Sequence, residues 1–212
     1  MAGQQAPVRV GILLSGRGSN FLALHAAIER GEVPGAEIAL VASNVPEAVG
    51  LAKAKDLGLA TFSVDHRGLD RGDHERALLV ALRVARVEWL CLAGYMRKLS
   101  PVLVGAFPRR ILNIHPSLLP AFPGLHAQRQ ALDYGVRVAG CTVHLVDDGL
   151  DSGPIVEQRT VPVNDGDTED ALSARILESE HQAYAFALRR LLSEPWRVEG
   201  RRVRFGPDSN QM

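Results

Sequence analysis

The sequence lacks the features that mark metal-binding and nucleic-acid-binding proteins. Only two of its 212 residues are cysteines, Cys91 and Cys141, and each stands among apolar residues, which is typical of a buried reduced thiol. No Cys-x-x-Cys pair occurs, and no two histidines stand at helical ligand spacing, so we expect no metal site. Twenty-four basic residues balance 24 acidic ones without a long basic run. We therefore expect no nucleic-acid partner, because binding a phosphate backbone requires a concentrated positive surface.

The amino-terminal segment lacks the apolar stretch of a targeting sequence. Residues 1–7 are polar and have no basic flank, so we predict neither a signal peptide nor a membrane anchor. The expected location is the cytoplasm, with no membrane partner. Apolar residues make up 46% of the chain and charged residues 23%, which is typical of one globular domain with a substantial core.

Strand and helix patterns alternate along the first half of the chain. Residues 8–14 are mostly aliphatic and end in a glycine-rich turn, which predicts a buried strand followed by a helix over 20–30. The same patterns predict strands at 37–42, 60–64 and 88–92, and helices at 46–56, 70–85 and 101–106, with Pro46 in the first turn of its helix. This alternation predicts right-handed βαβ units and a mostly parallel sheet.

The second half is less regular. We predict a strand at 110–114, a proline-rich loop at 115–124, a helix at 125–134, and a strand pair at 138–146 and 155–163. The last helix is predicted over 168–192, capped by Asp167 or Thr168. A small hairpin at 197–205 and a loose tail at 206–212 follow. The fold class is α/β, with one domain spanning residues 1–212.

A glycine-rich turn, Ser15-Gly16-Arg17-Gly18-Ser19-Asn20, follows the first strand. Glycines let the backbone approach an anion, and the start of the next helix offers free N–H groups. Phe21 stands where the dinucleotide-binding fingerprint requires a third glycine, so a phosphomonoester is favoured. The turn could instead serve only to join strand and helix, with Ser19 or Asn20 as an ordinary helix cap.

Asn113 and His115 are the strongest catalytic candidates. Strand alternation places them on the same side of the predicted strand, and Pro116 ends that strand. In acyl transfer an amide can donate a hydrogen bond to an oxyanion and an imidazole can move a proton. A structural polar pair that closes the top of the sheet is an equally open interpretation.

Further polar residues follow in the second half. The loop 147–153 contains three aspartates that could orient a histidine, and the sequence leaves open which of them does so. His144 could face the same pocket or the core, and Glu180 could lie on a solvated helix face. No Gly-x-Ser-x-Gly nucleophile motif occurs, which fits a reaction in which a substrate amine attacks.

Four motifs resemble those of the folate-dependent formyltransferases in order and spacing. They are the 15–20 turn, Leu92-Ala-Gly-Tyr-Met-Arg97, Asn113-Ile-His-Pro-Ser-Leu-Leu-Pro120 and Leu150-Asp-Ser-Gly-Pro154. The Ser-Gly-x-Gly-Ser-Asn turn is similar to that of the glycinamide ribonucleotide branch. The resemblance covers residues 8–192 and implies a Rossmann-like formyltransferase domain with a cis Leu119–Pro120 bond; Gln128 and Ser152 depart from the family pattern.

The resemblance also implies the reaction. The formyl group of 10-formyltetrahydrofolate would pass directly to the amine of glycinamide ribonucleotide, without a metal, in de novo purine biosynthesis. Residues 8–95 would bind the phosphosugar, residues 96–192 would hold the folate and the catalytic groups, and residues 193–212 would form the terminal hairpin and tail. We expect a monomer or a homodimer, and the sequence leaves open which.

Site residues follow from the same resemblance. Asn113, His115 and Asp151 match the catalytic positions. The phosphate and ribose contacts would come from Gly18, Ser19, Asn20, Arg71 and Glu180. The folate contacts would come from Met96, Arg97, Leu99, His144 and Asp147.

Three alternatives have different sequence requirements. A formyltetrahydrofolate hydrolase usually carries an extra amino-terminal domain, for which the residues before the first strand leave no room. A methionyl-tRNA formyltransferase usually has a further carboxyl-terminal domain, and zero net charge suits tRNA poorly. A non-catalytic phosphosugar-binding module could use the glycine turn but would not require Asn113, His115 or Asp151.

Overall fold

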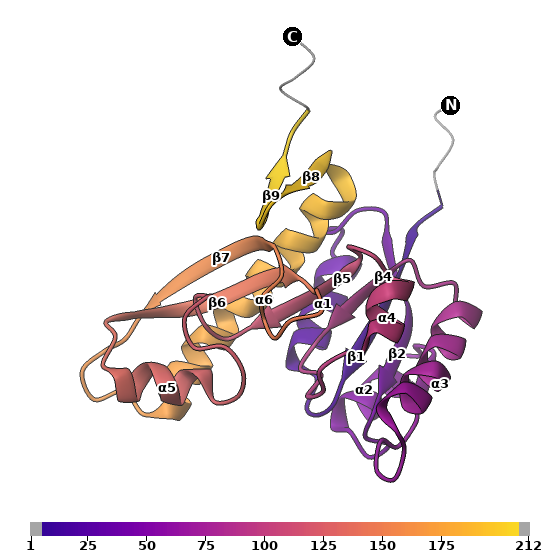
Figure 1. The fold of residues 1–212 in the computed structure, drawn as a ribbon, viewed down its shortest axis with the longest axis horizontal. Helices are drawn as coiled ribbons and strands as arrows, with labels where there is room; N and C mark the ends of the chain where they lie inside the picture. The colour runs from indigo at the N-terminus through magenta and orange to yellow at the C-terminus, as the bar shows by residue number, and fades with distance from the viewer. Residues whose placement is uncertain (1–5, 208–212) are drawn as a thin grey trace.

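One nine-stranded sheet runs through the protein, in the order β3-β2-β1-β4-β5-β6-β7-β9-β8 (Figure 1). The structure is a computed structural model and describes residues 6–207. Five parallel strands form one part of the sheet: β1 (Val8–Leu14), β2 (Ala36–Ser43), β3 (Thr61–Ser63), β4 (Trp89–Leu92) and β5 (Ile111–His115). The antiparallel pair predicted in the second half is formed by β6 (Val138–Leu145) and β7 (Ile155–Pro162). The expectation of a single, mostly parallel α/β domain is confirmed.

The terminal hairpin extends the sheet. It consists of β8 (Trp196–Glu199) and β9 (Arg202–Phe205), and β9 pairs with β7 through Arg202 and Ile155. The hairpin was predicted from the sequence, but its place in the sheet was not. Most of the predicted tail, residues 208–212, lies outside the described residues.

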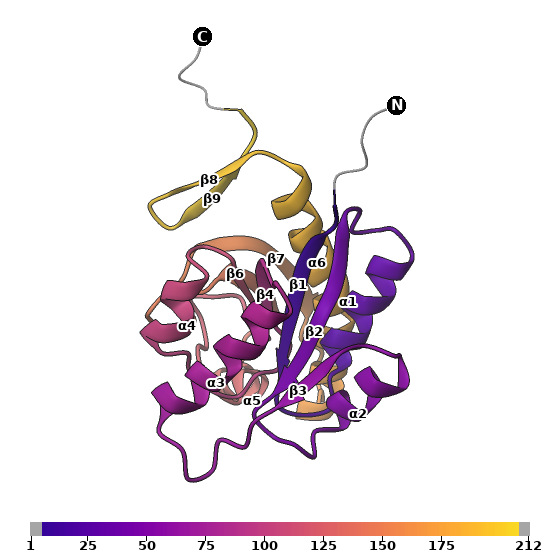
Figure 2. The same ribbon diagram turned by 90° about the vertical axis from the view of Figure 1, so that its right-hand side faces the viewer.

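Helices cover both faces of the parallel strands (Figure 2). One face carries α1 (Ser19–Glu29), α2 (Val49–Asp56) and α6 (Glu169–Ser193), and the other carries α3 (Arg71–Val84) and α4 (Pro101–Ala106). Side chains alternate along β1 accordingly, because Ile12 and Leu14 join one hydrophobic cluster and Leu13 joins the other. The remaining helix, α5 (Ala127–Tyr134), contacts α6.

Two predicted helix starts are wrong. Pro46 does not lie in a first helical turn, because α2 begins only at Val49. The Ser43 hydroxyl binds the backbone of Val45 instead, which holds this segment in a turn. Similarly, α5 begins at Ala127 because His126 adopts left-handed backbone angles, with φ 57°. The last helix is capped by Thr168, one of the two predicted residues.

The strand order creates a switch point beside β1. The chain moves from β1 to β2 and β3 on one side and then returns to β4 on the other side. Open α/β sheets bind ligands at such a point, outside the carboxyl ends of the strands. The loops after β1 and β4 meet there, since the Ser15 N–H donates to Gly94 O at 3.0 Å and the Met96 N–H donates to Ser15 Oγ at 2.8 Å. The glycine turn and the predicted folate wall therefore share one edge of the sheet.

Among residues 6–207, no helix combines the length and the apolar character needed to cross a membrane.

Candidate active site

A cavity of about 540 Å³ opens at the carboxyl ends of β4 and β5. All the predicted catalytic and folate-binding residues line it: Met96, Arg97, Leu99, Asn113, His115, His144, Asp147 and Asp151. A second cavity, of about 520 Å³, lies between α1 and α6 and contains none of these residues. The constellation predicted from the sequence therefore belongs to one cavity.

Asn113 is held by a buried histidine of the neighbouring strand. The two residues are register partners on β5 and β6, and Asn113 Nδ2 lies 3.1 Å from His144 Nε2. His144 Nδ1 lies 3.0 Å from the carbonyl oxygen of Leu145. Because a carbonyl only accepts hydrogen bonds, the His144 proton is on Nδ1 and Nε2 accepts from the amide. This leaves the second amide hydrogen of Asn113 free for a ligand.

Burial keeps His144 neutral. Its side chain is almost fully enclosed, and desolvation lowers its pKa below the usual value. A neutral imidazole preserves the acceptor at Nε2, whereas a protonated ring would repel the Asn113 amide. His144 thus contacts the site through Asn113.

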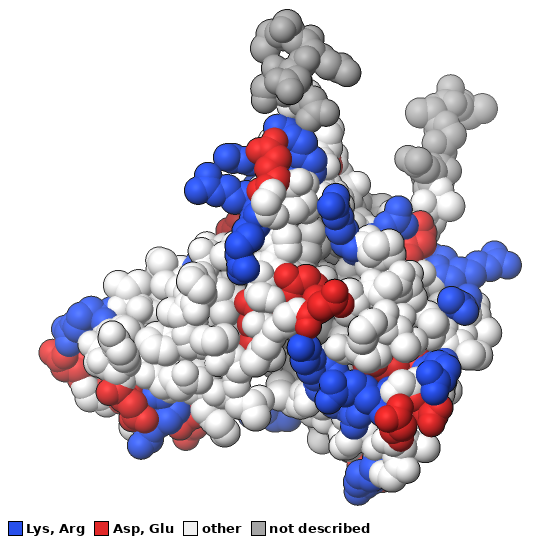
Figure 3. All heavy atoms as spheres, viewed as in Figure 1, with Lys and Arg blue, Asp and Glu red and all other residues white. Residues whose placement is uncertain are grey.

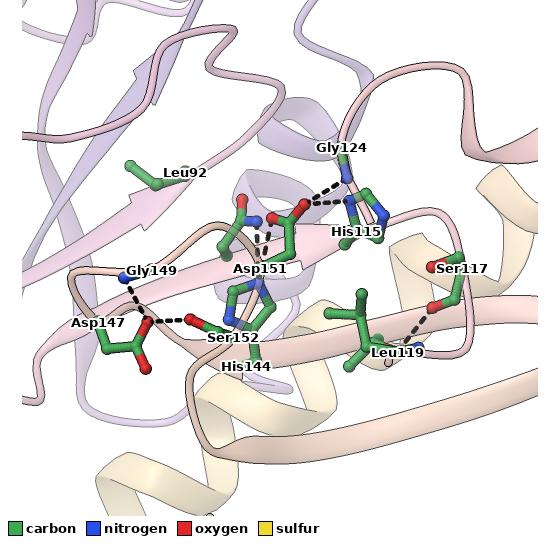
Figure 4. A network of polar contacts seen from close by, with 12 residues as sticks. Leu92, His115, Ser117, Leu119, Gly124, His144, Asp147, Gly149, Asp151 and Ser152 are labelled. Carbon is green, nitrogen blue, oxygen red and sulfur yellow. Dashed lines mark hydrogen bonds and ion pairs between the residues drawn. The ribbon is translucent and has the colours of Figure 1, made fainter. Parts of the chain in front are cut away.

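His115 faces the carboxylate of Asp151 (Figure 4). His115 Nε2 donates to the carbonyl oxygen of Phe122 at 2.9 Å, and His115 Nδ1 lies 3.5 Å from Asp151 Oδ2. The contact between Nδ1 and the carboxylate is favourable only when a proton lies between them. A ring nitrogen and a carboxylate thus face each other in the site, which is the geometry that a proton relay requires.

Asp151 is fixed by its own surroundings. The Gly124 N–H donates to Asp151 Oδ2 at 2.8 Å, whereas the unprotonated His144 Nε2, 3.8 Å from Asp151 Oδ1, makes no hydrogen bond to the carboxylate. The backbone of Asp151 has a φ of 48°, a left-handed conformation that aspartate adopts more readily than most residues other than glycine. Asp151 is the aspartate of the loop that contacts the histidine, a choice the sequence left open.

The neighbouring aspartate, Asp147, shapes the same loop. Its Oδ1 accepts from the Gly149 N–H at 3.0 Å and from the Ser152 hydroxyl at 2.7 Å. Gly153 must lack a side chain, since a Cβ there would lie 1.8 Å from the carbonyl oxygen of Leu145. These contacts set the path of the chain into Asp151.

The glycine turn ends in an uncapped helix. The cap of α1 is Gly18, with a φ of 71°, and no side chain caps the first turn. The alternative in which Ser19 or Asn20 is the cap is therefore wrong. A Cβ at position 18 would lie 2.9 Å from Gly50 Cα, so both the angle and the close approach require glycine. The first turn of α1 therefore keeps backbone N–H groups that no capping side chain satisfies.

Asn20 and Glu180 form a buried pair beside this turn. Asn20 Nδ2 donates to Glu180 Oε2 at 2.8 Å, while Asn20 Oδ1 is buried without a partner among the described residues. Glu180 is 6% exposed, so the solvated-face alternative is wrong. Burial raises the pKa of Glu180 to about 7, partly offset by the bond from Asn20.

Arg71 stands apart from these contacts. It is the exposed first residue of α3, it does not line the cavity, and it makes no ion pair with any residue between 6 and 207.

The proline-rich loop supplies groups that the sequence analysis missed. The Phe122 carbonyl and the Gly124 N–H anchor His115 and Asp151, and His126 lines the cavity. Phe122, Gly124 and His126 all have positive φ angles. Only at position 124, where the residue is glycine, does the sequence indicate such an angle. The Leu119–Pro120 bond is cis, as the resemblance implied.

Residues 6–207 contain no group of three or more His, Cys, Asp or Glu side chains arranged to hold a metal ion.

Comparison with known proteins identifies the family. The family model described as formyl transferase matches residues 8–188. The chain belongs to the formyl transferase family. Phosphoribosylglycinamide formyltransferase of Escherichia coli (strain K12) is 40% identical over 191 residues, which cover 90% of this chain and 87% of that protein.

Other relatives of this formyl transferase differ in length. The trifunctional purine biosynthetic protein adenosine-3 of Drosophila pseudoobscura pseudoobscura is 47% identical over 188 residues, covering 87% of this chain but only 14% of that protein. The chain thus spans about one seventh of that relative. The crystal structure of glycinamide ribonucleotide transformylase 1 from Symbiobacterium toebii superimposes with a TM-score of 0.91 at 45% identity, covering 97% of this chain and 99% of that one.

Proposed function

We propose that this chain transfers the formyl group of 10-formyltetrahydrofolate to the amine of glycinamide ribonucleotide, giving formylglycinamide ribonucleotide and tetrahydrofolate. The observation that carries the proposal is the convergence of Asn113, His115 and Asp151 in one cavity, next to the glycine turn. Relatives of nearly the same length are named for this activity.

Asn113 and His115 stabilise the developing oxyanion. Attack of the neutral amine on the formyl carbon places a negative charge on the formyl oxygen and a positive charge on the amine nitrogen. The free amide hydrogen of Asn113, oriented by His144, donates to that oxygen. Donors aimed at a developing oxyanion in this way typically contribute about 10²–10³ to kcat.

Asp151 and His115 transfer the proton from the amine to N10. The amine must lose one proton and N10 must gain one before the C–N10 bond breaks. Asp151 accepts the amine proton, directly or through water, and His115 Nδ1 shares it across the 3.5 Å contact. The proton then passes to N10, so no covalent enzyme intermediate and no net proton change arise.

The glycine turn binds the substrate phosphate. Gly18, Ser19 and Asn20 offer uncapped backbone N–H groups at the positive end of α1, and the unpaired Asn20 Oδ1 and the Glu180 carboxyl offer polar contacts to ribose. Arg71, free of ion pairs within 6–207, is assigned to the same anion. Residues 8–95 are thus the phosphosugar half.

The folate ring occupies the cavity wall formed by residues 96–99 and 144–147. Leu99 supplies an apolar floor and is 6% exposed, whereas Met96 is 65% exposed at the rim. Arg97, His144 and Asp147 provide polar groups on either side. We place the enzyme in the cytoplasm as a monomer or homodimer acting on these two small molecules, without metal, nucleic acid or membrane.

The test is a comparison of acceptors. Purified protein is incubated with 10-formyltetrahydrofolate and glycinamide ribonucleotide, methionyl-tRNA or buffer alone, and tetrahydrofolate release is followed. Release that depends on glycinamide ribonucleotide supports the proposal. Release in buffer indicates a hydrolase, release with methionyl-tRNA indicates the tRNA enzyme, and ribonucleotide binding without turnover indicates a binding module.

A further inference from the structure

The first serine of the glycine turn is bonded to the loop that follows β4. Ser15 Oγ accepts the Met96 N–H at 2.8 Å and donates to Asn44 Oδ1 at 2.6 Å. The direction of both bonds is fixed, because a backbone N–H only donates and an amide oxygen only accepts. A hydroxyl carries a single hydrogen, so Ser15 has none left to donate to a phosphate.

The second serine of the turn differs in this respect. Ser19 Oγ makes no hydrogen bond to any residue from 6 to 207, and Ser19 is the first residue of the uncapped helix α1. Its hydroxyl therefore stays available to a ligand, whereas the Ser15 hydroxyl is used within the protein. Two identical side chains of one turn thus differ in what they can bind.

Asn44 is a fixed partner for Ser15. It directly follows β2, is 2% exposed, and its carbonyl oxygen accepts from His66 Nδ1 at 2.8 Å. The loops that follow β1, β2 and β4 therefore meet at the Ser15 hydroxyl. Replacement of Ser15 by alanine would leave both the Met96 N–H and the buried Asn44 Oδ1 without this partner, which is unfavourable.

Glu75 holds the other end of the segment 96–99. It is 2% exposed, whereas the other charged residues of α3 are exposed, and Figure 3 shows acidic and basic side chains grouped on the surface over this helix. Glu75 Oε1 accepts the Ser100 N–H at 2.8 Å, and Oε2 accepts the Ser100 hydroxyl. Ser100 Oγ in turn caps α4 by accepting the Val102 N–H at 3.2 Å. The segment is thus fixed by Ser15 at its start and by Glu75 at its end.

From these contacts we infer that Ser15 and Glu75 are positioning residues for the folate, which fix the segment 96–99 without touching the co-substrate. The inference rests on the proposed function. All four residues of the segment line the cavity, whereas Ser15 and Glu75 do not. The glycine turn is then divided between the two substrates, with Ser15 serving the folate and Ser19 the ribonucleotide.

The size of the effect follows from the bonds that are lost. A segment that is no longer tied must be ordered by the folate itself, so the affinity falls by about the contribution of the lost bond. One hydrogen bond corresponds to about a three- to tenfold change in an equilibrium constant. Ser15→Ala should therefore raise the Kd for tetrahydrofolate and the KM for 10-formyltetrahydrofolate about three- to tenfold, and those for glycinamide ribonucleotide less than about twofold.

Isothermal titration with tetrahydrofolate and with glycinamide ribonucleotide, alongside steady-state kinetics, measures both affinities in the wild type and in Ser15→Ala, Glu75→Ala and Glu75→Gln. Glutamine keeps one acceptor oxygen for the Ser100 N–H, so the folate affinity of Glu75→Gln should lie between those of Glu75→Ala and the wild type. Ser19→Ala is the matched control, because it makes the same change at the other serine of the turn and should weaken ribonucleotide binding instead. Urea unfolding identifies the folded variants, and Ser15→Ala, at a half-buried position, decides the outcome if Glu75→Ala does not fold.

Two outcomes would overturn the inference. One is wild-type affinity for the folate in Ser15→Ala or in folded Glu75→Ala. The other is a loss of ribonucleotide affinity in Ser15→Ala as large as its loss of folate affinity. Both are distinct from failure of the proposed function, in which the wild type would transfer no formyl group to glycinamide ribonucleotide.

Discussion

Replacement of Glu180 by glutamine should remove a pH dependence from the stability of the protein. Glu180 lies in α6, is 6% exposed and accepts one hydrogen bond, from Asn20 Nδ2. Burial raises its pKa from 4.5 to about 7. Such a rise means that folding favours the protonated over the ionised carboxyl by about 3 kcal/mol.

The sign follows from linkage. Between pH 4.5 and 7 the native state keeps a proton that the unfolded state has lost, so stability falls as the pH rises through this window. Glutamine is neutral and of similar shape. Nearby Cys141 and Tyr184 do not titrate in the window, because burial raises the pKa of Cys141 to about 12 and that of Tyr184 well above its usual value.

Urea unfolding at pH 5, 6, 7 and 8 measures the effect. The free energy of unfolding of Glu180→Gln relative to wild type should increase by about 2–3 kcal/mol between pH 5 and pH 8, with nearly all of the change below pH 7. A difference between the two proteins that stays constant with pH would refute the reasoning, because the Glu180 carboxyl would then have an ordinary pKa.

Further predictions concern the reaction. Asp151→Asn should lower kcat at least about 10²- to 10³-fold while changing the KM for glycinamide ribonucleotide little. Steady-state kinetics with both substrates measures this, and near-normal turnover would contradict the prediction. His144→Phe should lower kcat toward the value of Asn113→Ala, because His144 acts through Asn113. If the two reductions in kcat multiplied in the double variant, the two residues would act independently, against this prediction. Ser19→Ala should raise the KM for the ribonucleotide more than that for the folate, since Ser19 opens α1 at the phosphate cradle; the reverse order would remove this turn from phosphate binding.

The sequence predicted the parallel half of the fold because its signals are local. Strand and helix periodicities fix β1 to β5, and strand alternation correctly places Asn113 and His115 on one side of β5. Two helix starts were predicted too early: before α2 the Ser43 hydroxyl binds the backbone of Val45, and before α5 the backbone of His126 adopts a left-handed conformation. No local signal reveals either.

Contacts between residues far apart in the chain could not be predicted from the sequence. The pairing of Asn113 with His144 joins residues 31 positions apart, and that of Asn20 with Glu180 joins residues 160 apart. Loop chemistry alone could not separate Asp147 from Asp151. Only the folded β6–β7 loop shows that one binds its own loop and the other faces His115.

The central claim is direct transfer of the formyl group to the substrate amine by Asn113, His115 and Asp151. A 10-formyltetrahydrofolate labelled with carbon-13 in the formyl group tests it most directly, in a single turnover with excess enzyme and glycinamide ribonucleotide, read by mass spectrometry. We predict that all the label appears on the ribonucleotide amine in step with tetrahydrofolate, and that the Asn113→Ala and His115→Ala variants bind both substrates without transferring it. Label released as formate, or transfer at the wild-type rate by those variants, would contradict the account.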